Sequence, residues 1–118
     1  MGRPAKYNVD LMRGDSKTFS LNFTSNGITP INITGWTIYY TVKRELGDND
    51  ADAVIHKIIT VHTDPTHGQT EIVLNNSDTQ NLDTETFWHD IQVVNLAGKI
   101  NTIITGQLNV LADVTRAY

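Results

Sequence analysis

Four histidines, at positions 56, 62, 67 and 89, could act as metal ligands or as bases in this chain. Their spacings match no short zinc motif, and no pair lies at i and i+4. His62 and His67 flank a proline turn, so we interpret both as exposed loop imidazoles. His89 shares its strand face with Phe87 and Ile91, which indicates a hydrogen-bonded core or edge residue rather than a ligand or a base.

An acidic segment at positions 48–52 places carboxylates at alternate positions, as at the start of a calcium-binding loop. If Asp48 is counted as the first position, the sixth is Ala53 in place of the sharply turning glycine. The twelfth is Ile59 in place of a bidentate glutamate. We therefore interpret the segment as an ordinary solvated acidic loop.

Two further patterns with known chemistry have simpler interpretations. Arg13-Gly14-Asp15 is the tripeptide that integrins bind on flexible loops, but here it falls between two expected strands and is typical of a tight turn. No Gly-x-Ser-x-Gly setting for a nucleophile occurs, and the absence of cysteine excludes thiolate catalysis and cysteine-ligated metals. We expect no enzymatic activity, no cofactor and no metal site.

Length and charge narrow the function classes. A chain of 118 residues can bury one core, and we expect a single domain over residues 1–118. The formal net charge is −4 and the cationic residues are scattered, which argues against direct binding to nucleic acid or to a membrane surface. The first six residues lack the apolar region of a secretory signal.

The elements that would position any site are expected to be strands. Trp36 to Val42 alternates aromatic and β-branched residues and predicts a central strand at the core. Residues 87–93 form a second alternating run. A third run follows a turn at 95–98. In it Ile100, Thr102 and Ile104 share one face, and Leu108 and Val110 extend the run. The second and third runs together predict a long hairpin. Shorter strands are expected within residues 7–12, 19–23, 53–61 and 71–74, and turns at 25–30 and 62–68.

One short helical turn is expected at residues 76–82, where Ser77 or Asp78 could cap it and Leu82 would pack on the sheets. About seven short strands, with no helix long enough for a βαβ crossover, predict an all-β fold. The expected architecture is an antiparallel two-sheet β-sandwich, and a small closed barrel is the competing one.

Aromatic side chains supply the candidate surface. The alternation assigns Trp36 and Tyr40 to the core and turns Tyr39 and Trp88 to the opposite faces of their strands, where they are candidates for an interface or a glycan contact. Residues 1–6 are a candidate docking arm whose cations could meet acidic partners. The predicted interface residues are therefore Arg3, Lys6, Tyr39 and Trp88.

Many weak signals also occur in a particular order and spacing along nearly the whole chain. They are Tyr7-Asn8-Val9-Asp10-Leu11, Arg13-Gly14-Asp15, Phe19-x-Leu21-x-Phe23, Ile33-Thr34-Gly35-Trp36-Thr37, Ser77-Asp78-Thr79, Phe87-x-His89-Asp90-Ile91-Gln92-Val93, Gly106-x-Leu108-x-Val110 and Val114-Thr115-Arg116. In this order the chain resembles a family of small tailed-phage proteins similar to the N-terminal domain of phage baseplate upper proteins. Position 89 departs from the pattern, because His stands where an aromatic residue is expected before Asp90.

The resemblance implies an immunoglobulin-like β-sandwich that is made in the host cytoplasm and acts in the virion as a non-catalytic building block. It implies other virion proteins as partners, and leaves open whether the chain also forms a homo-oligomer. Because no receptor-binding or fibre domain is fused to it, we expect a capsid decoration, cement or accessory adaptor role on the major capsid protein. A tail, baseplate or fibre-attachment protein is the alternative, and a carbohydrate-binding module is a further one.

Overall fold

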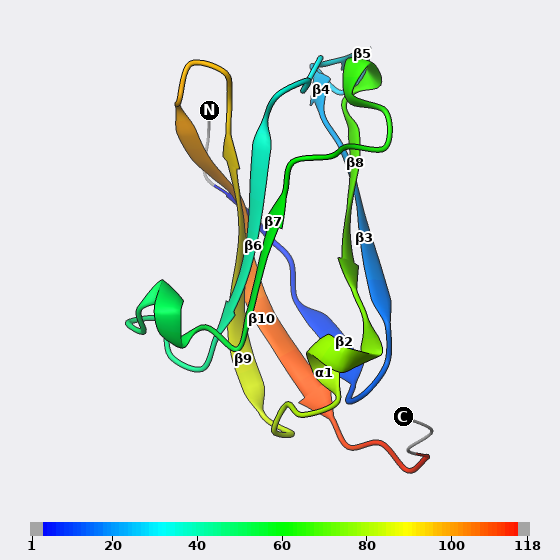
Figure 1. Ribbon diagram of the computed structural model, residues 1–118, viewed down its shortest axis with the longest axis vertical. Helices are drawn as coiled ribbons and strands as arrows, with labels where there is room; N and C mark the ends of the chain where they lie inside the picture. The colour runs from blue at the N-terminus through cyan, green and yellow to red at the C-terminus, as the bar shows by residue number, and fades with distance from the viewer. Residues whose placement is uncertain (1–3, 116–118) are drawn as a thin grey trace.

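The structure is a computed structural model that describes residues 4–115 (Figure 1). It is organised around the long C-terminal hairpin. Its two strands, β9 and β10, lie in a six-stranded sheet, here called sheet A, with the order β1-β10-β9-β6-β7, and β2 also pairs with β10. The β9–β10, β9–β6 and β6–β7 pairs are antiparallel, whereas β1 and β2 run parallel to β10. The strands of sheet A are β1 (Ala5–Lys6), β2 (Val9–Met12), β6 (Thr37–Lys43), β7 (Ile55–Ile59), β9 (Thr86–Val94) and β10 (Ile100–Leu111).

A second, two-stranded sheet, here called sheet B, covers one face of sheet A (Figure 1). It pairs β3 (Lys17–Asn22) with β8 (Gln69–Leu74) in antiparallel register. A small ribbon of β4 (Thr24–Ser25) and β5 (Thr29–Pro30) follows β3. The arrangement is the expected immunoglobulin-like β-sandwich.

The helical segments are short and lie in the connections. They are η1 (Asp50–Asp52), η2 (Pro65–His67) and α1 (Asn76–Thr79). The expected helical turn is confirmed, but its cap differs from the prediction. The turn begins after Asn75, whose backbone N–H donates to the Asp78 carboxylate at 2.8 Å. Within residues 4–115 no helix is long and apolar enough to cross a membrane.

The core lies between the two sheets, where the inward faces of their strands meet. The alternation predicted for β6 and β9 is confirmed: Ile38, Tyr40 and Val42 are buried, as is every second residue of β9 from Phe87 to Val93. Sheet B contributes Phe19, Ile72 and Leu74, among others. Each large apolar side chain buried in this way contributes about 1.5–3 kcal/mol to folding.

The simple alternation expected for residues 100–110 is wrong at one point. The register between β9 and β10 shifts between Thr102 and Ile104, which marks a β-bulge. Ile104 lies opposite Ile91, and Leu108 and Val110 are buried beyond it, whereas Ile100 is 61% exposed. The bulge therefore reverses the alternation of β10: the even-numbered residues face outward before it, as Ile100 does, and face the core after it, as Leu108 and Val110 do.

His62 also differs from its prediction as an exposed loop residue. It is half-buried, and both of its ring nitrogens have partners: Nδ1 lies 2.8 Å from Oγ1 of Thr70, and Nε2 lies 2.7 Å from the backbone oxygen of Trp36. Thr70 belongs to β8 and Trp36 immediately precedes β6. This side chain therefore joins the two sheets.

Between β1 and β2, which pair with the same edge of β10 in one continuous register, the N-terminal segment approaches β10 closely at Tyr7 and Asn8. The Tyr7 N–H donates to the Thr105 carbonyl at 2.9 Å, and the Gln107 N–H donates to Oδ1 of Asn8 at 3.0 Å. Between these two bonds lies Gly106, where a Cβ atom would collide with the Tyr7 carbonyl group. Only glycine leaves room for this close approach.

The same carbonyl reaches a buried histidine. Nε2 of His89 lies 2.7 Å from the Tyr7 oxygen, and Nδ1 lies 2.9 Å from Oη of Tyr40. A carbonyl only accepts, so Nε2 donates to Tyr7 and, in the neutral ring, Nδ1 accepts from Tyr40. Burial lowers the pKa of His89 and raises the pKa of Tyr40. The expectation of a hydrogen-bonded core histidine is confirmed.

We predict that Gly106→Ala lowers the free energy of unfolding by about 1–3 kcal/mol, because the new methyl group forces the Tyr7 backbone away from β10. Gly106 has no positive φ, so the cost is steric. The matched control is Gly47→Ala, where a Cβ meets nothing within 4 Å. Urea denaturation of both variants checks this, and an equal stability of Gly106→Ala and the parent would contradict it.

A second prediction concerns acid stability. Because the pKa of folded His89 lies below its ordinary value of 6.5, the unfolded chain binds more protons as the pH falls through that value. The free energy of unfolding should then decrease, with a contribution of at most about 1.4 kcal/mol per pH unit. His89→Gln, which keeps a donor and an acceptor, should remove this contribution, and His67→Gln should keep it. Denaturation at a series of pH values measures it, and an unchanged slope in His89→Gln would refute the assignment.

Candidate functional site

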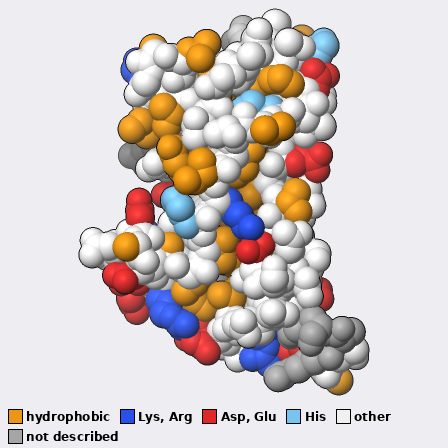
Figure 2. Space-filling view, viewed as in Figure 1, with side chains coloured by type: hydrophobic (Ala, Val, Ile, Leu, Met, Phe, Trp, Pro, Cys, Tyr) orange, Lys and Arg blue, Asp and Glu red, His pale blue; other side chains and the backbone are white. Residues whose placement is uncertain are grey.

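The outer face of sheet A is hollowed into a groove of about 1060 Å³, here called the outer-face groove. Its floor consists of outward-facing side chains of β6, β9 and β10. Leu46 and Asp50 of the β6–β7 connection line one end, and Val94 and Ile100 of the β9–β10 hairpin line the other. Both connections project to the left of the sheets in Figure 1, and the outline in Figure 2 is indented between them.

Strand register arranges the floor as rows across the sheet. One row contains Thr41, Asp90 and Thr105, one from each of β6, β9 and β10. On either side of it, Lys43 lies opposite Trp88, and Tyr39 lies opposite Gln92. The groove therefore has a polar row in the middle and one aromatic residue toward each end.

The middle row extends to both edges of sheet A. His56 of β7 pairs with Thr41, and its Nδ1 lies 3.0 Å from the Thr41 Oγ1. The His56 ring also stacks on Tyr39, with the ring centroids 6.0 Å apart. On the other side, Lys6 of β1 pairs with Thr105. Five strands thus contribute to a single polar line.

The charges of the groove are balanced. Nζ of Lys43 lies 2.8 Å from Oδ1 of Asp50, and this hydrogen bond raises the pKa of Lys43 and lowers the pKa of Asp50. Asp90 is half-buried, and burial raises the pKa of its carboxyl group, although the positive charge of Lys43 opposes the shift. Lys6 is the other cation of the lining.

The groove also contains polar groups without partners in the protein. Within residues 4–115, no hydrogen bond engages Nε1 of Trp88, Oη of Tyr39 or the carboxylate of Asp90. All three residues are half-buried. In the described chain, every fully buried side-chain nitrogen or oxygen atom has a hydrogen-bond partner, so an atom without a partner is not fully buried. These three groups therefore reach solvent and are available to a ligand.

The structure brings together three of the four predicted interface residues. Lys6, Tyr39 and Trp88 all line the outer-face groove, although they come from β1, β6 and β9. Arg3 lies outside the described residues, as do the first three positions of the expected docking arm. Ala5 and Lys6 of that arm pair with β10 in sheet A. Asp90 and His56 also belong to this site. The sequence did not indicate them, because only the pairing of β6, β7 and β9 brings them there.

Among the other patterns singled out in the sequence, the acidic segment contributes only Asp50 to the groove, and the Arg13-Gly14-Asp15 tripeptide contributes nothing to it. Asp50 belongs to a 3₁₀ turn and pairs with Lys43. Gly14 has a φ of 88°, the Asp15 N–H donates to the Met12 carbonyl at 3.0 Å as in a turn, and Arg13 pairs with Asp113 at 2.8 Å. In the described part of the chain, no three His, Asp or Glu side chains form a group that could hold a metal ion.

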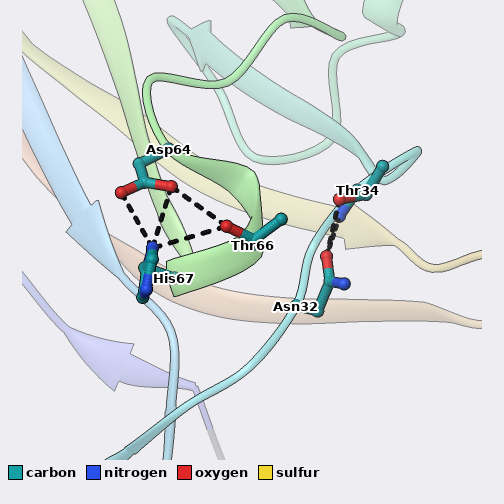
Figure 3. Close-up of polar contacts among 5 residues, drawn as sticks. All are labelled: Asn32, Thr34, Asp64, Thr66 and His67. Atoms are coloured by element: carbon teal, nitrogen blue, oxygen red, sulfur yellow. Dashed lines mark hydrogen bonds and ion pairs between the residues drawn. The ribbon is translucent and has the colours of Figure 1, made fainter.

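Polar residues at the far end of the sandwich form two separate local networks (Figure 3). His67 and Thr66 bond the Asp64 carboxylate, and the His67 ring lowers the pKa of that carboxyl group. The Asn32 side chain accepts from the backbone and hydroxyl of Thr34, at 3.0 and 2.6 Å. Each network closes on its own loop, so we assign the candidate site to the outer-face groove.

The fold is similar to those of several solved structures. The N-terminal domain of phage TP901-1 ORF48 matches with a TM-score of 0.55 and 15% identity, over 92% of this chain and 89% of that domain. The sequence resemblance to an N-terminal phage domain is thus confirmed at the level of the fold.

Proteins of other kinds share the same fold. A chain from a photo-crosslinking study of cell-adhesive interactions of VGSC beta subunits matches with a TM-score of 0.52 and 14% identity, over 90% of this chain and 92% of that one. CopC from Methylosinus trichosporium OB3b matches with a TM-score of 0.50 and 14% identity, over 94% and 89%. No family model and no curated protein sequence matches the chain. Because these functions differ, the shared fold does not select one of them.

The charge balance of the groove gives a prediction. Lys43→Met should raise the pKa of Asp90 further, because it removes the cation that opposes the effect of burial and leaves Asp50 unpaired nearby. Lys57→Met is the matched control, since Lys57 pairs with Asp78 at 2.8 Å outside the groove. A pH titration of carboxyl ¹³C shifts measures the change. An Asp90 pKa that stays the same or falls in Lys43→Met would be evidence against this electrostatic picture.

Proposed function

We propose that this chain is a non-catalytic bacteriophage virion structural protein that docks on other particle proteins. The observation that carries the proposal is that the fold likeness to the N-terminal domain of phage TP901-1 ORF48, over 92% of this chain and 89% of that domain, coincides with the sequence resemblance to small tailed-phage proteins. The fold alone would not select this role, and the order and spacing of the sequence motifs, which resemble those of small tailed-phage proteins, favour it over the other proteins with this fold.

The arrangement of the groove residues supports the non-catalytic part of the proposal. The Thr41 hydroxyl and the His56 ring form a hydroxyl–imidazole pair, as a nucleophile and a base would. Over residues 4–115, however, no carboxylate bonds the second ring nitrogen of His56 to orient it. The Thr41 side chain belongs to the regular ladder of β6 between two paired strands, where no turn presents backbone donors for an oxyanion.

For the docking surface we propose the outer edge of β7, here called the β7 edge. β7 pairs with β6 on one side, and none of the described strands pairs with its other side. Its residue Ile58 is 58% exposed, and Val61, just beyond the strand, is 86% exposed. An open edge beside exposed apolar side chains favours strand addition by a neighbouring subunit. Repeated copies in a symmetric particle would strengthen individually weak contacts.

Within the virion, we place the protein on the capsid as a decoration, cement or accessory adaptor protein, with the tail, baseplate or fibre attachment as the alternative. Crosslinking mass spectrometry of purified particles through Lys6, Lys43 and Lys99 distinguishes the two. Crosslinks to the major capsid protein would support the first, and crosslinks to tail or fibre subunits the second. Absence of the chain from purified particles would refute the virion role.

A variant pair tests the docking surface. Ile58→Lys should reduce incorporation into particles at least tenfold, because it places a charge where a neighbouring subunit buries apolar surface. Val73→Lys is the matched control, since Val73 is an exposed aliphatic residue (47%) on β8 of the other sheet. Quantitative mass spectrometry of purified particles measures both, with circular dichroism to check folding. Equal incorporation of the two folded variants would rule out the β7 edge as the docking surface.

A further inference from the structure

We infer that the outer-face groove binds a neutral oligosaccharide. This inference does not rest on the virion role. It assigns a ligand to the outer face of sheet A, next to the open backbone of the β7 edge, where Ile58 lies opposite Tyr39. It starts from the shape of the site. The groove is concave, has a volume of about 1060 Å³, and is lined by aromatic rings together with a few polar groups, as small-molecule sites are.

The two aromatic residues set the length of the ligand. Trp88 lies opposite Lys43, and Lys43 is four residues from Tyr39 along β6. Since each strand residue advances about 3.3 Å, the two aromatic positions are about 13 Å apart along the strands. One sugar ring is too short to contact both side chains. Rings that stack their apolar C–H faces on Trp88 and Tyr39 would belong to one oligosaccharide that crosses the polar row between them.

The polar row fits hydroxyl groups. Asp90 lies between the two aromatic positions, and its carboxylate accepts no hydrogen bond within the described residues. The indole N–H of Trp88 and the hydroxyl of Tyr39 are likewise available, and Gln92 and Gln107 line the same groove. Sugar hydroxyls donate and accept at once, so adjacent hydroxyls can satisfy a carboxylate and an amide together. The site thus offers acceptors and donors at the positions that such a ligand needs.

Charge distinguishes a neutral sugar from other occupants. The lining contains two lysines and two aspartates, and Lys43 already pairs with Asp50. A polyanion or a basic peptide would find no excess of opposite charge. A protein that covered the groove would have to desolvate the half-buried Asp90 carboxylate, which is costly unless a donor meets it. The backbone groups of β6 and β9 are also occupied within the sheet, so an added strand has no ladder to join.

The test is binding of the full chain to an array of neutral oligosaccharides, followed by titration with those that bind. The chain has two tryptophans, so Trp36→Phe leaves Trp88 as the only tryptophan, whose emission can be excited selectively over that of tyrosine. We expect its emission to change on titration, with an affinity insensitive to salt because the ligand is uncharged. Trp88→Ala and Asp90→Ala should each weaken binding at least tenfold. Trp88→Phe, which keeps an aromatic ring, should weaken it less, and Val73→Ala on β8 should leave it unchanged.

Thermal unfolding of each variant separates loss of the site from loss of the fold, and Asp90→Asn offers a milder change where Asp90→Ala does not fold. The inference is overturned if no neutral oligosaccharide binds, or if folded Trp88→Ala binds as well as the parent. It is also overturned if folded Trp88→Ala is no longer incorporated into particles, because the groove would then be a protein interface. If the chain binds a sugar but is absent from purified particles, the virion role is refuted and the sugar-binding site stands.

Discussion

The close approach of the N-terminal segment to β10 at Gly106 is the constraint on which the rest of the structure depends. Gly106 leaves the space through which the Tyr7 carbonyl reaches the buried His89 ring, and Tyr40 holds the other side of that ring. This one network joins β6, β9 and the segment between β1 and β2. It fixes β1 beside β10, and so it places Lys6 at the end of the polar row of the outer-face groove.

The two faces of sheet A therefore have different roles although they share the same strands. The inner face carries the apolar core, and the network around His89 is the buried polar exception to it. The outer face carries the balanced charges and the available polar groups of the groove. Alternation along β9 makes this division, because Phe87, His89 and Ile91 face sheet B while Trp88, Asp90 and Gln92 face solvent. Stability and binding can thus change independently along one strand.

Sequence patterns were sufficient for the sandwich, the central strand β6 and the outward direction of Tyr39 and Trp88, because alternation is a local property. They failed where a distant partner decides the outcome. The bulge between Thr102 and Ile104 depends on the pairing with β9, and the two bonds of His62 depend on Trp36 and Thr70. Asp90 and His56 joined the site only through strand register. The close approach at Gly106 is marked in the sequence only by a glycine, and a glycine is compatible with many other structures.

A cryo-EM map of the native particle tests the central claim most directly, because it shows which surface of the sandwich meets its neighbours. Our account predicts density for this domain with the β7 edge against another virion protein and the outer-face groove open to solvent. A map in which a neighbouring subunit fills the groove would contradict the assignment of the two surfaces. Particles that contain no density for the domain would contradict the virion role itself.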